Sequence, residues 1–388
     1  MARPASYLNL DPMPLPPSRR LFLVSNTAWS IANFRLGLAL GLREAGYEPI
    51  AVAPPDEHVQ RILDAGLSYL PVEMNRKGTN PVEDLALMLV LRRLMRQWQP
   101  MAYLGWTIKP NVYGGLACRQ LGIPSIHNIA GLGFAFSQDS MLNRVARQLY
   151  RWGLGRAHHV FFQNTDDQRL MLDAGLVAPG IASRLPGSGV DTTHFPMTPL
   201  PPAGNRPLRL LMVSRLLREK GVGELAEAVR RLRLHGLPVE VRLLGPFDTG
   251  NPAALHPEEI RAWEKEGLLL HLGSTNDVRP HLADCDAVVL PSHYREGLPR
   301  TLLEAASMGR PIITTDWVGC RDAVVDGLTG LLCQPRDPED LARCIEQLAR
   351  MPSNERAEMG RRGRERIERE FDEKLIVNAY LATIAPLG

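Results

Sequence analysis

The sequence predicts an α/β protein built from two doubly wound domains. Short apolar runs alternate with amphipathic stretches from Leu21 onward, which is typical of parallel strands joined by helical crossovers. Five prolines fall within the twelve residues 196–207 and indicate a linker. The length of 388 residues suits two domains of ordinary size. We therefore expect one Rossmann-like domain at residues 20–195, the linker at 196–207 and a second Rossmann-like domain at 208–371.

The first domain follows a proline-rich stretch, residues 1–19, which lacks the apolar core of a signal peptide and is expected to be a disordered tail. Apolar runs bounded by turn-forming residues predict strands at Leu21–Ser25, Ile50–Ala53, Tyr69–Val72, Ala102–Gly105, Ser125–Asn128 and His159–Gln163. Apolar residues at helical spacing predict helices at Asn33–Ala45, His58–Ala65, Pro81–Trp98, Lys109–Leu121, Met141–Leu154 and Thr165–Ala174. Asn80 is suited to cap the third of these helices, with Pro81 in its first position.

The second domain repeats the alternation. Strands are predicted at Leu208–Ser214, Val239–Leu244, Leu268–Leu272, Ala287–Leu290, Pro311–Thr314 and Leu331–Cys333. Helices are predicted at Gly223–Leu234, Pro257–Glu266, Val278–Ala283, Pro299–Ser307, Cys320–Val325, Pro338–Arg350 and Asn354–Phe371, the last with its arginines on a solvated face. A final helix at Glu373–Ile384, within residues 372–388, closes the chain, and packing back on the first domain is one arrangement open to it.

The composition excludes several classes of protein. A hydrophobic fraction of 45% and a charged fraction of 22% are ordinary for a globular protein. The net charge of +3 divides into +5 before residue 196 and −2 after it, which favours an anionic partner or membrane surface for the first half and argues against nucleic acid. The five cysteines include no C-x-x-C pair, so we expect reduced thiols in the cytoplasm and no zinc or disulfides. The longest apolar run, residues 85–91, is far shorter than the roughly 20 residues that span a bilayer.

Two carboxylates frame the start of a predicted helix in the stretch Ser292–Met308. Glu296 lies in the loop before the helix and Glu304 lies within it. Pro299 is suited to the first helical position, where its missing N–H would have had no partner. The N–H groups of Arg300 and Thr301 would then point from the positive helix end and could hold a phosphate.

Two cations follow the first strand of the second domain, in the segment Val213–Gly221. Arg215 comes directly after that strand and Lys220 stands five residues later. Ligands of doubly wound sheets bind at the carboxyl ends of the strands, so both cations are expected on the same rim as Glu296. Neither domain contains a G-x-G-x-x-G fingerprint or a Walker A loop, which disfavours NAD(P)-dependent and P-loop functions.

Taken in order, these segments resemble the retaining glycosyltransferases of family 4. The segments that carry the resemblance are Arg215 with Lys220, His271–Gly273, Glu296 to Glu304 as E-x7-E, Val318-Gly319 and Gly327–Leu332. The resemblance implies the GT-B fold, in which two Rossmann-like domains face each other across a cleft, and metal-independent transfer from a nucleotide sugar without a cofactor. It assigns the donor diphosphate to Arg215 and Lys220, with the backbone around Leu298, Arg300 and Thr301 closing on the phosphates. It assigns the donor sugar to Glu296, which with the two cations forms the catalytic set, the ribose to Glu304 and the base to Val278.

The first domain resembles the subgroup of this family that extends polyprenyl-diphosphate-linked sugars. The segments concerned are Ser30–Arg35, Lys109–Gly114 and Gly131–Phe134. They imply an acceptor site, for which the candidates are Asn33, Arg35, Lys109, Asn111, His127 and Phe134. The chain departs from many relatives in having Leu298-Pro299 where they have Phe-Gly, and Ala130 where they have histidine.

The sequence thus predicts a hexosyltransferase that moves a sugar, most simply an N-acetylhexosamine, from a UDP-sugar to an undecaprenyl-diphosphate-linked saccharide. It would act in surface glycan assembly, peripherally on the inner face of the cytoplasmic membrane. The helix Met141–Leu154 carries arginines beside an apolar stripe, which suits either a membrane interface or ordinary core packing. Two alternatives stay open: a transferase of the same fold with a soluble acceptor, and a non-catalytic protein that binds nucleotide sugars or acts as a scaffold.

Overall fold

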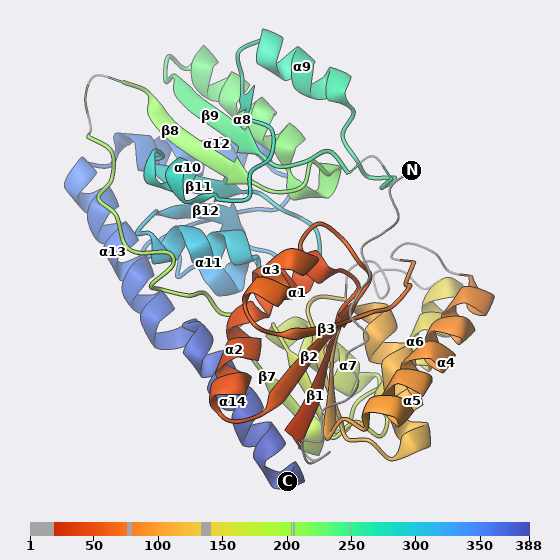
Figure 1. Cartoon of the computed structure of the whole chain (residues 1–388). Helices are drawn as coiled ribbons and strands as arrows, with labels where there is room; N and C mark the ends of the chain where they lie inside the picture. Colours follow the sequence, from red (N-terminus) through yellow and green to blue (C-terminus); the bar gives the residue numbers. More distant parts are fainter. Residues whose placement is uncertain (1–18, 76–79, 133–140, 203, 205, 249) are drawn as a thin grey trace, which may run out of the picture.

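The computed structural model describes residues 19–75, 80–132, 141–202, 204, 206–248 and 250–388, and it consists of two α/β domains, one above the other in Figure 1. Each domain is a parallel sheet covered by helices on both faces, as the sequence predicts. The fold class is therefore confirmed.

The first domain contains a seven-stranded parallel sheet with the order β3-β2-β1-β4-β5-β6-β7. Its strands are β1 (Arg20–Val24), β2 (Glu48–Ala53), β3 (Ser68–Pro71), β4 (Ala102–Trp106), β5 (Ser125–Ile129), β6 (His159–Phe162) and β7 (Ala182–Arg184). Its helices are α1 (Ala28–Phe34), α2 (Leu36–Glu44), α3 (Val59–Asp64), α4 (Pro81–Trp98), α5 (Gly115–Leu121), α6 (Met141–Leu154) and α7 (Thr165–Asp173), with a π-helical turn at Pro110–Gly114.

Both faces of this sheet are buried, because residues along each strand alternate between two cores. Leu21 and Leu23 of β1 pack with α1, α2 and α3, whereas Phe22 and Val24 pack with α4 and α5. A strand that is covered on both faces has to be apolar at every position, which explains the short continuous apolar runs in the sequence.

The second domain contains a six-stranded parallel sheet with the order β10-β9-β8-β11-β12-β13. Its strands are β8 (Leu208–Val213), β9 (Val239–Leu244), β10 (Leu270–His271), β11 (Ala287–Leu290), β12 (Ile312–Thr315) and β13 (Gly330–Cys333). Its helices are α8 (Val222–Leu234), α9 (Pro257–Lys265), α10 (Arg279–Ala283), α11 (Arg300–Ser307), α12 (Pro338–Arg350) and α13 (Ser353–Glu370).

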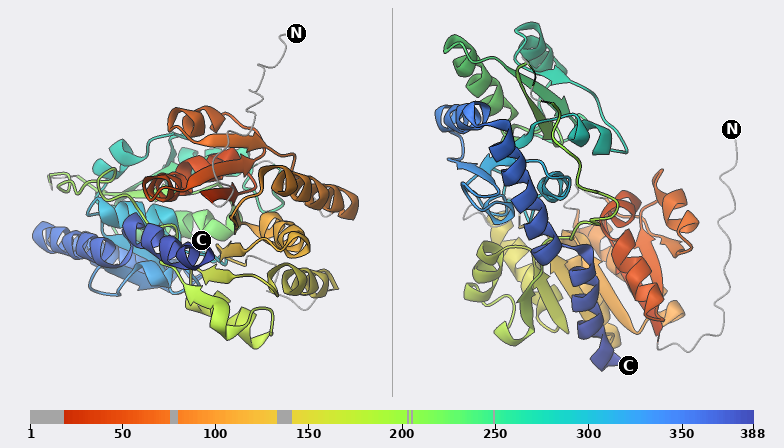
Figure 2. Two further views of the ribbon diagram at one scale, coloured as in Figure 1. Left: turned by 60° about the horizontal axis from the view of Figure 1, so that its bottom comes forward. Right: turned by 90° about the vertical axis from the view of Figure 1, so that its left-hand side faces the viewer.

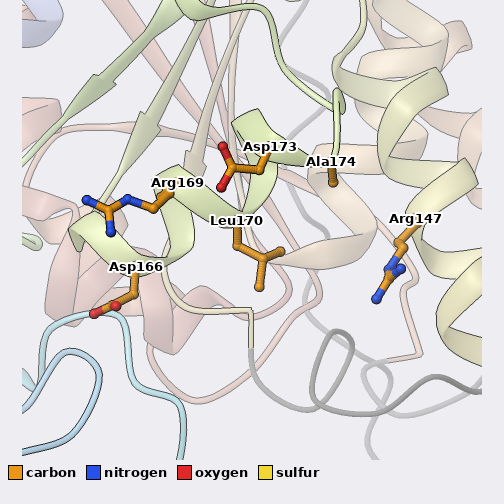
Figure 3. A pocket seen from close by; sticks show the side chains of 6 residues that line it. All are labelled: Arg147, Asp166, Arg169, Leu170, Asp173 and Ala174. Carbon is orange, nitrogen blue, oxygen red and sulfur yellow. The ribbon is translucent and has the colours of Figure 1, made fainter.

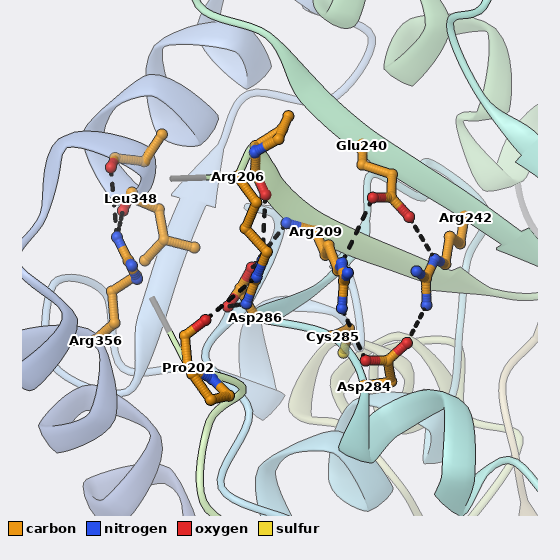
Figure 4. A network of polar contacts seen from close by, with 12 residues as sticks. Pro202, Arg206, Arg209, Glu240, Arg242, Asp284, Cys285, Asp286, Leu348 and Arg356 are labelled. Carbon is orange, nitrogen blue, oxygen red and sulfur yellow. Dashed lines mark hydrogen bonds and ion pairs between the residues drawn. The ribbon is translucent and has the colours of Figure 1, made fainter. Parts of the chain in front are cut away.

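The proline-rich linker is anchored to the second domain. The guanidinium of Arg206 donates two hydrogen bonds to Asp286, of 2.6 and 2.9 Å, just before β11. Figure 4 shows this pair within a larger set of ion pairs at the amino ends of the strands, the edge opposite the expected ligand edge. The fully buried Arg310 donates to the backbone oxygens of Thr198 and Pro199. These contacts fix the linker against the sheet.

The chain crosses back to the first domain near its C-terminus. Helix α13 runs along the second domain, and α14 (Glu373–Ile384) packs against α2 of the first domain, as both views in Figure 2 show. Ile376, Tyr380 and Ile384 of α14 are buried in the same core as Leu21 and Leu23. At the crossing, the backbone of Val190 bonds to Phe371 and Glu373, so two segments connect the domains side by side.

Some local predictions are wrong. Helix α1 begins at Ala28 rather than Asn33, because the Thr27 hydroxyl accepts the Ser30 N–H and caps it. Cys320–Val325 forms only a three-residue 3-10 turn, since Val324 is extended and the Val325 N–H bonds to the Thr329 hydroxyl. Strand β7 is not among the predicted elements.

Two predictions concerning α11 and α13 also need correction. Pro299 is the N-cap of α11 and not its first residue, because its ψ of 112° is extended and its carbonyl accepts the Leu302 N–H. The predicted solvated face of α13 includes Arg364, which instead donates to the carbonyl oxygens of Thr192, Phe195 and Ser307. Arg364 thus supplies donors to backbone carbonyls of the domain crossing, of which the Phe195 oxygen also accepts the Ser307 hydroxyl at 2.7 Å.

Candidate active site

The candidate site of the second domain lies where the strand order reverses, between β8 and β11. Arg215 follows β8, and the segment 292–296 follows β11. In doubly wound sheets, loops leave these two neighbouring strands toward opposite faces and open a crevice in which ligands bind. The first domain has the same reversal between β1 and β4, and its loops meet the second domain here: the Asn164 amide donates to the backbone oxygen of Glu296 at 3.0 Å.

Lys220 and Glu296 form an ion pair at this crevice. Both side chains are mostly buried, with 12% and 13% of their surface exposed, and the Ser292 hydroxyl donates to the same carboxylate oxygen at 3.0 Å. The Lys220 ammonium also lies 5.5 Å from the centre of the Tyr294 ring. The structure thus brings together the cation predicted for the phosphate and the carboxylate predicted for the sugar.

Arg215 is placed differently from Lys220. Its guanidinium is about half exposed and pairs with Asp248, on the loop after β9, at 2.9 Å. The pair is solvated, so it holds Arg215 only weakly. Arg215 can therefore turn toward an anion at the end of β8.

Glu304 is mostly buried, with 13% of its side chain exposed, and pairs with Arg300 at 2.9 Å. Burial raises the pKa of Glu304, and the charge and hydrogen bond of Arg300 partly offset this rise. The Arg300 guanidinium lies 5.5 Å from the ring centre of Phe34, so this side chain reaches across to the first domain. Among the described residues, the N–H groups of Arg300 and Thr301 at the start of α11 have no hydrogen-bond partner.

Leu298 and Val278 are packing residues in the structure. Leu298 is buried against Gly187, where an added Cβ would lie 2.9 Å from the leucine methyl carbon. Val278 precedes α10 and packs partly on the core of the second domain. Its loop approaches the end of β8 indirectly, since the Gly245 N–H bonds to the Gly273 oxygen at 2.7 Å and Gly245 contacts Ser214.

Arg35, one of the predicted acceptor residues, lies close enough to Arg300 of the second domain to be affected by its charge. Its side chain is buried, lies 5.2 Å from the ring centre of Trp106, and donates to the Phe34 backbone oxygen at 3.1 Å. Its pKa is lowered to about 10, mainly by burial and to a smaller extent by the nearby charge of Arg300, while Tyr380 acts in the opposite direction. Within the part of the chain that the structure describes, Arg35 has no carboxylate partner. A buried cation of this kind is suited to an anionic ligand.

The other acceptor candidates are engaged elsewhere. Asn33 bonds to Trp29 and Arg61 on the outer surface. Lys109 pairs with Asp84 of α4 at 2.6 Å, and Phe134 lies outside the described residues.

Asn111 and His127 lie together in a buried network. Asn111 donates to the Asn128 oxygen at 3.0 Å and presents its own oxygen to His127 Nδ1 at 3.2 Å. The Nδ1 atom must therefore carry the proton, while Nε2 faces the Ser125 hydroxyl at 2.9 Å. Burial lowers the pKa of His127 to about 3, which keeps the ring neutral. Both side chains lie in the interior of the first domain, with 1% of Asn111 and none of His127 exposed.

Sequence reasoning missed three residues that join the domains at the site: Asn164, Asp167 and Arg295. Arg295 Nε donates to the Asp167 carboxylate at 2.7 Å, and Asn164 bonds to the backbone of Glu296 and Gly297. The local pattern N-x-x-D after a strand indicates only a helix cap. Contacts across 128 or more residues leave no trace in a single sequence.

A separate pocket of about 490 Å³ lies between α6 and α7 and contains none of the predicted residues (Figure 3). Its lining residues are Arg147, Asp166, Arg169, Leu170, Asp173 and Ala174. In the described part of the chain, no cluster of three or more histidine, cysteine or acidic side chains is placed to hold a metal ion. No helix in that part is both long and apolar enough to cross a membrane.

Comparison with known families matches both domains to glycosyltransferases. The model described as "Glycosyl transferase 4-like domain" matches residues 31–183, and the model described as "Glycosyl transferases group 1" matches residues 207–351. The protein belongs to glycosyltransferase family 4.

Relatives of this glycosyltransferase support the assignment. The N,N'-diacetylbacillosaminyl-diphospho-undecaprenol alpha-1,3-N-acetylgalactosaminyltransferase of Campylobacter jejuni is 26% identical over 93% of this chain and 97% of its own. Glycogen synthase of Mycobacterium tuberculosis is 31% identical, but over only 53% of this chain and 50% of its own.

Solved structures show the same fold. HepE of Anabaena, in complex with UDP and glucose, has a TM-score of 0.77 at 17% identity and covers 95% of this glycosyltransferase and 100% of its own chain. Sucrose-phosphate synthase of Thermosynechococcus elongatus has a TM-score of 0.78 at 17% identity, covering 95% of this chain and 99% of its own. At 17% identity the likeness establishes the GT-B fold alone, so the substrate has to be inferred from the residues of the site.

Proposed function

We propose that this glycosyltransferase moves an N-acetylhexosamine from a UDP-sugar to an undecaprenyl-diphosphate-linked saccharide, with retention of configuration and without a metal ion. The single observation that carries the proposal is the paired arrangement of Lys220 with Glu296 beside the first N–H groups of α11. Together they offer one cation, one helix end and one carboxylate to a ligand that combines a diphosphate with hydroxyl groups. A nucleotide sugar has this composition.

The proposed reaction uses these groups as follows. Arg215, Lys220 and the N–H groups of Arg300 and Thr301 hold the diphosphate and stabilise its charge as it leaves. The bond from the anomeric carbon to phosphate breaks, and a bond to the acceptor oxygen forms on the same face. The acceptor proton passes to the departing phosphate oxygen. Glu296 orients the sugar.

The nucleotide and the acceptor occupy opposite sides of this centre. Glu304 would accept hydrogen bonds from the ribose hydroxyls. The acceptor is proposed to bind the first domain, where Arg35 provides a buried cation without a carboxylate partner among the described residues. The net charge of +5 in the first half of the chain also suits an acceptor that carries a diphosphate. The Campylobacter relative, which matches over nearly its whole length, is named for a diphospho-undecaprenol substrate.

The same proposal places the protein on the inner face of the cytoplasmic membrane. Helices α4 and α6 both pack on α5 and lie along one side of the first domain (Figures 1 and 2). Large apolar side chains are exposed on both: Val82 at 74% and Leu85 at 53% on α4, and Val145 at 54% and Trp152 at 49% on α6. On α6, Arg144 and Arg151 stand next to these residues in the sequence, as is typical of helices that lie in an anionic lipid interface. On α4, the residues between Val82 and Leu85 are acidic, and its arginines lie nearer its C-terminal end.

A transfer assay tests the proposal directly. The purified protein is incubated with a panel of UDP-sugars and either undecaprenyl-diphosphate-linked or water-soluble saccharides, and both nucleotide release and product mass are recorded. We expect lipid-linked product with the wild type and none with Glu296→Ala or the isosteric Glu296→Gln, whereas Glu355→Ala, an exposed change on α13, stays active. Full activity of both Glu296 variants would disprove the assigned site. Transfer only to soluble saccharides would favour the soluble acceptor, and donor binding without turnover would favour a scaffold.

A further inference from the structure

The backbone of the segment that carries Glu296 is held by the other domain. The side-chain amide of Asn164 donates to the backbone oxygens of Glu296 and Gly297, at 3.0 and 3.1 Å. Arg295, the residue before Glu296, donates from Nε to the Asp167 carboxylate at 2.7 Å. Asn164, the cap of α7, and Asp167, within α7, therefore bind the three consecutive residues 295–297 of the second domain.

Close packing leaves this segment little freedom. A Cβ added to Gly131 of the first domain would lie 2.7 Å from the Gly297 nitrogen, and one added to Gly319 would lie 2.4 Å from the Gly297 oxygen. Gly297 is thus enclosed between one loop from each domain. Movement of the first domain by a fraction of an ångström would move the backbone on which the Glu296 carboxylate is mounted.

Asp167 is the centre of this contact. Its side chain has no exposed surface, and it accepts the Leu132 N–H at 3.2 Å and the Asn164 amide at 3.0 Å as well as Arg295. Burial raises the pKa of Asp167, and its bonds to Arg295, Asn164 and Leu132 lower it again. Leu132 belongs to the loop after β5, on the acceptor side. Asp167 therefore links that loop to the residue beside Glu296.

We infer that Asn164 and Asp167 are positioning residues, which fix the position of the Glu296 carboxylate when the two domains meet. They thereby couple the acceptor side of the site to the donor sugar. The inference rests on the proposed role of Glu296. Arg215, Lys220 and Glu304 all belong to the second domain, so binding of the nucleotide does not need this contact. Loss of the contact should reduce turnover and spare donor affinity.

Three variants test the inference: Asp167→Asn, Arg295→Gln and the double variant. Misplacing a reacting group by about 1 Å costs on the order of 100-fold in rate, so each single variant should lose about 10- to 100-fold in kcat with donor KM within about threefold of the wild type. The double variant should lose no more kcat than the worse single variant, because both single variants remove the same ion pair between Asp167 and Arg295. Asp166→Asn is the matched control, since it removes a charge from the same helix turn without touching Arg295.

Hydrogen exchange provides a readout that does not depend on any substrate. A peptide covering residues 292–299 should exchange about tenfold faster in Arg295→Gln and Asp167→Asn than in the wild type and Asp166→Asn. If Asp167→Asn fails to fold, Arg295→Gln alone tests the inference, because this substitution leaves α7 and its cap intact. Unchanged kcat and exchange in Arg295→Gln, or losses that multiply in the double variant, would overturn the inference. An inactive wild type would refute the proposed function instead, and the exchange result would still decide whether the contact holds the segment.

Discussion

Gly297→Ala tests the closeness of the two domains at the site with a single methyl group. The Cβ would lie 2.6 Å from the Ala130 oxygen and 2.5 Å from Gln163 Oε1. The Gln163 oxygen belongs to a buried side chain whose amide donates to Asn128 at 3.0 Å, and the Ala130 oxygen belongs to the backbone. An ordinary contact between carbon and oxygen is about 3.3 Å or more, so the first domain would have to withdraw by about 0.7 Å.

The size of the effect follows from this clash. Overpacking of a well-packed site costs about 1–3 kcal/mol, and a cost of about 2 kcal/mol would reduce the population of closely packed molecules about 30-fold. We therefore expect kcat to fall by roughly 10- to 100-fold. The free energy of unfolding should change little, because the domains can separate slightly and relieve the clash without disturbing either core.

The assay is release of UDP from the donor in the presence of acceptor, with thermal unfolding measured in parallel. Gly180→Ala serves as the control, because a Cβ there meets no atom within 4 Å. Gly297→Ala protein with kcat within threefold of the wild type would refute the reasoning, as would a large loss of stability with normal turnover.

Three other changes test the charges and the domain crossing. Burial raises the pKa of Glu304 above 4.5, so ionisation of this carboxyl lowers the stability of the wild type as the pH rises from 4.5. Glu304→Gln should therefore melt at a higher temperature than the wild type at pH 7 and at the same temperature near pH 4. It should also bind UDP more weakly in calorimetry. The pKa of His127 is about 3 in the folded protein and 6.5 ordinarily, so the unfolded state gains a proton that the folded state does not as the pH falls. The free energy of unfolding of the wild type should therefore drop by about 2 kcal/mol between pH 8 and pH 5. Urea titrations of His127→Asn should not show this loss. Arg364→Ala should cost about 2–4 kcal/mol by leaving the Thr192 and Ser307 carbonyl oxygens unpaired, since the Phe195 oxygen keeps the Ser307 hydroxyl. Arg362→Ala, on the exposed side of the same helix, should cost less than about 1 kcal/mol in the same titrations.

Local rules predict those parts of the fold in which local interactions decide the structure. Helix α4 has the predicted bounds because Asn80 caps it by accepting the Val82 N–H and Pro81 fits its first position. The rules fail where side chains compete for the backbone. Thr27 caps α1, so the helix begins five residues ahead of the predicted start at Asn33. The Thr329 hydroxyl accepts the N–H of Val325, where the sequence predicts a helix.

The candidate site is predictable in the second domain for a topological reason. Arg215, Lys220 and Glu296 follow neighbouring strands, so the sheet order alone brings their segments to one crevice. In the first domain the use of each polar side chain depends on a partner far along the chain. Lys109 is neutralised by Asp84 and Asn111 is bound to His127, and neither pairing can be recognised from the spacing of the residues.

The charge pairing in the structure places a condition on donor binding. Lys220, which is proposed to hold a phosphate, is paired with Glu296, and Arg300 is paired with Glu304. Both carboxylates are proposed to accept hydroxyl groups of the donor. A diphosphate alone would take the cations and leave two mostly buried carboxylates beside new negative charge, which is unfavourable. Under the proposed assignment, the ribose and sugar hydroxyls of a whole nucleotide sugar would donate to Glu304 and Glu296 in place of the cations. If these roles hold, the pairing should favour the intact donor over either of its parts, because only the intact donor offers partners to all four side chains at once.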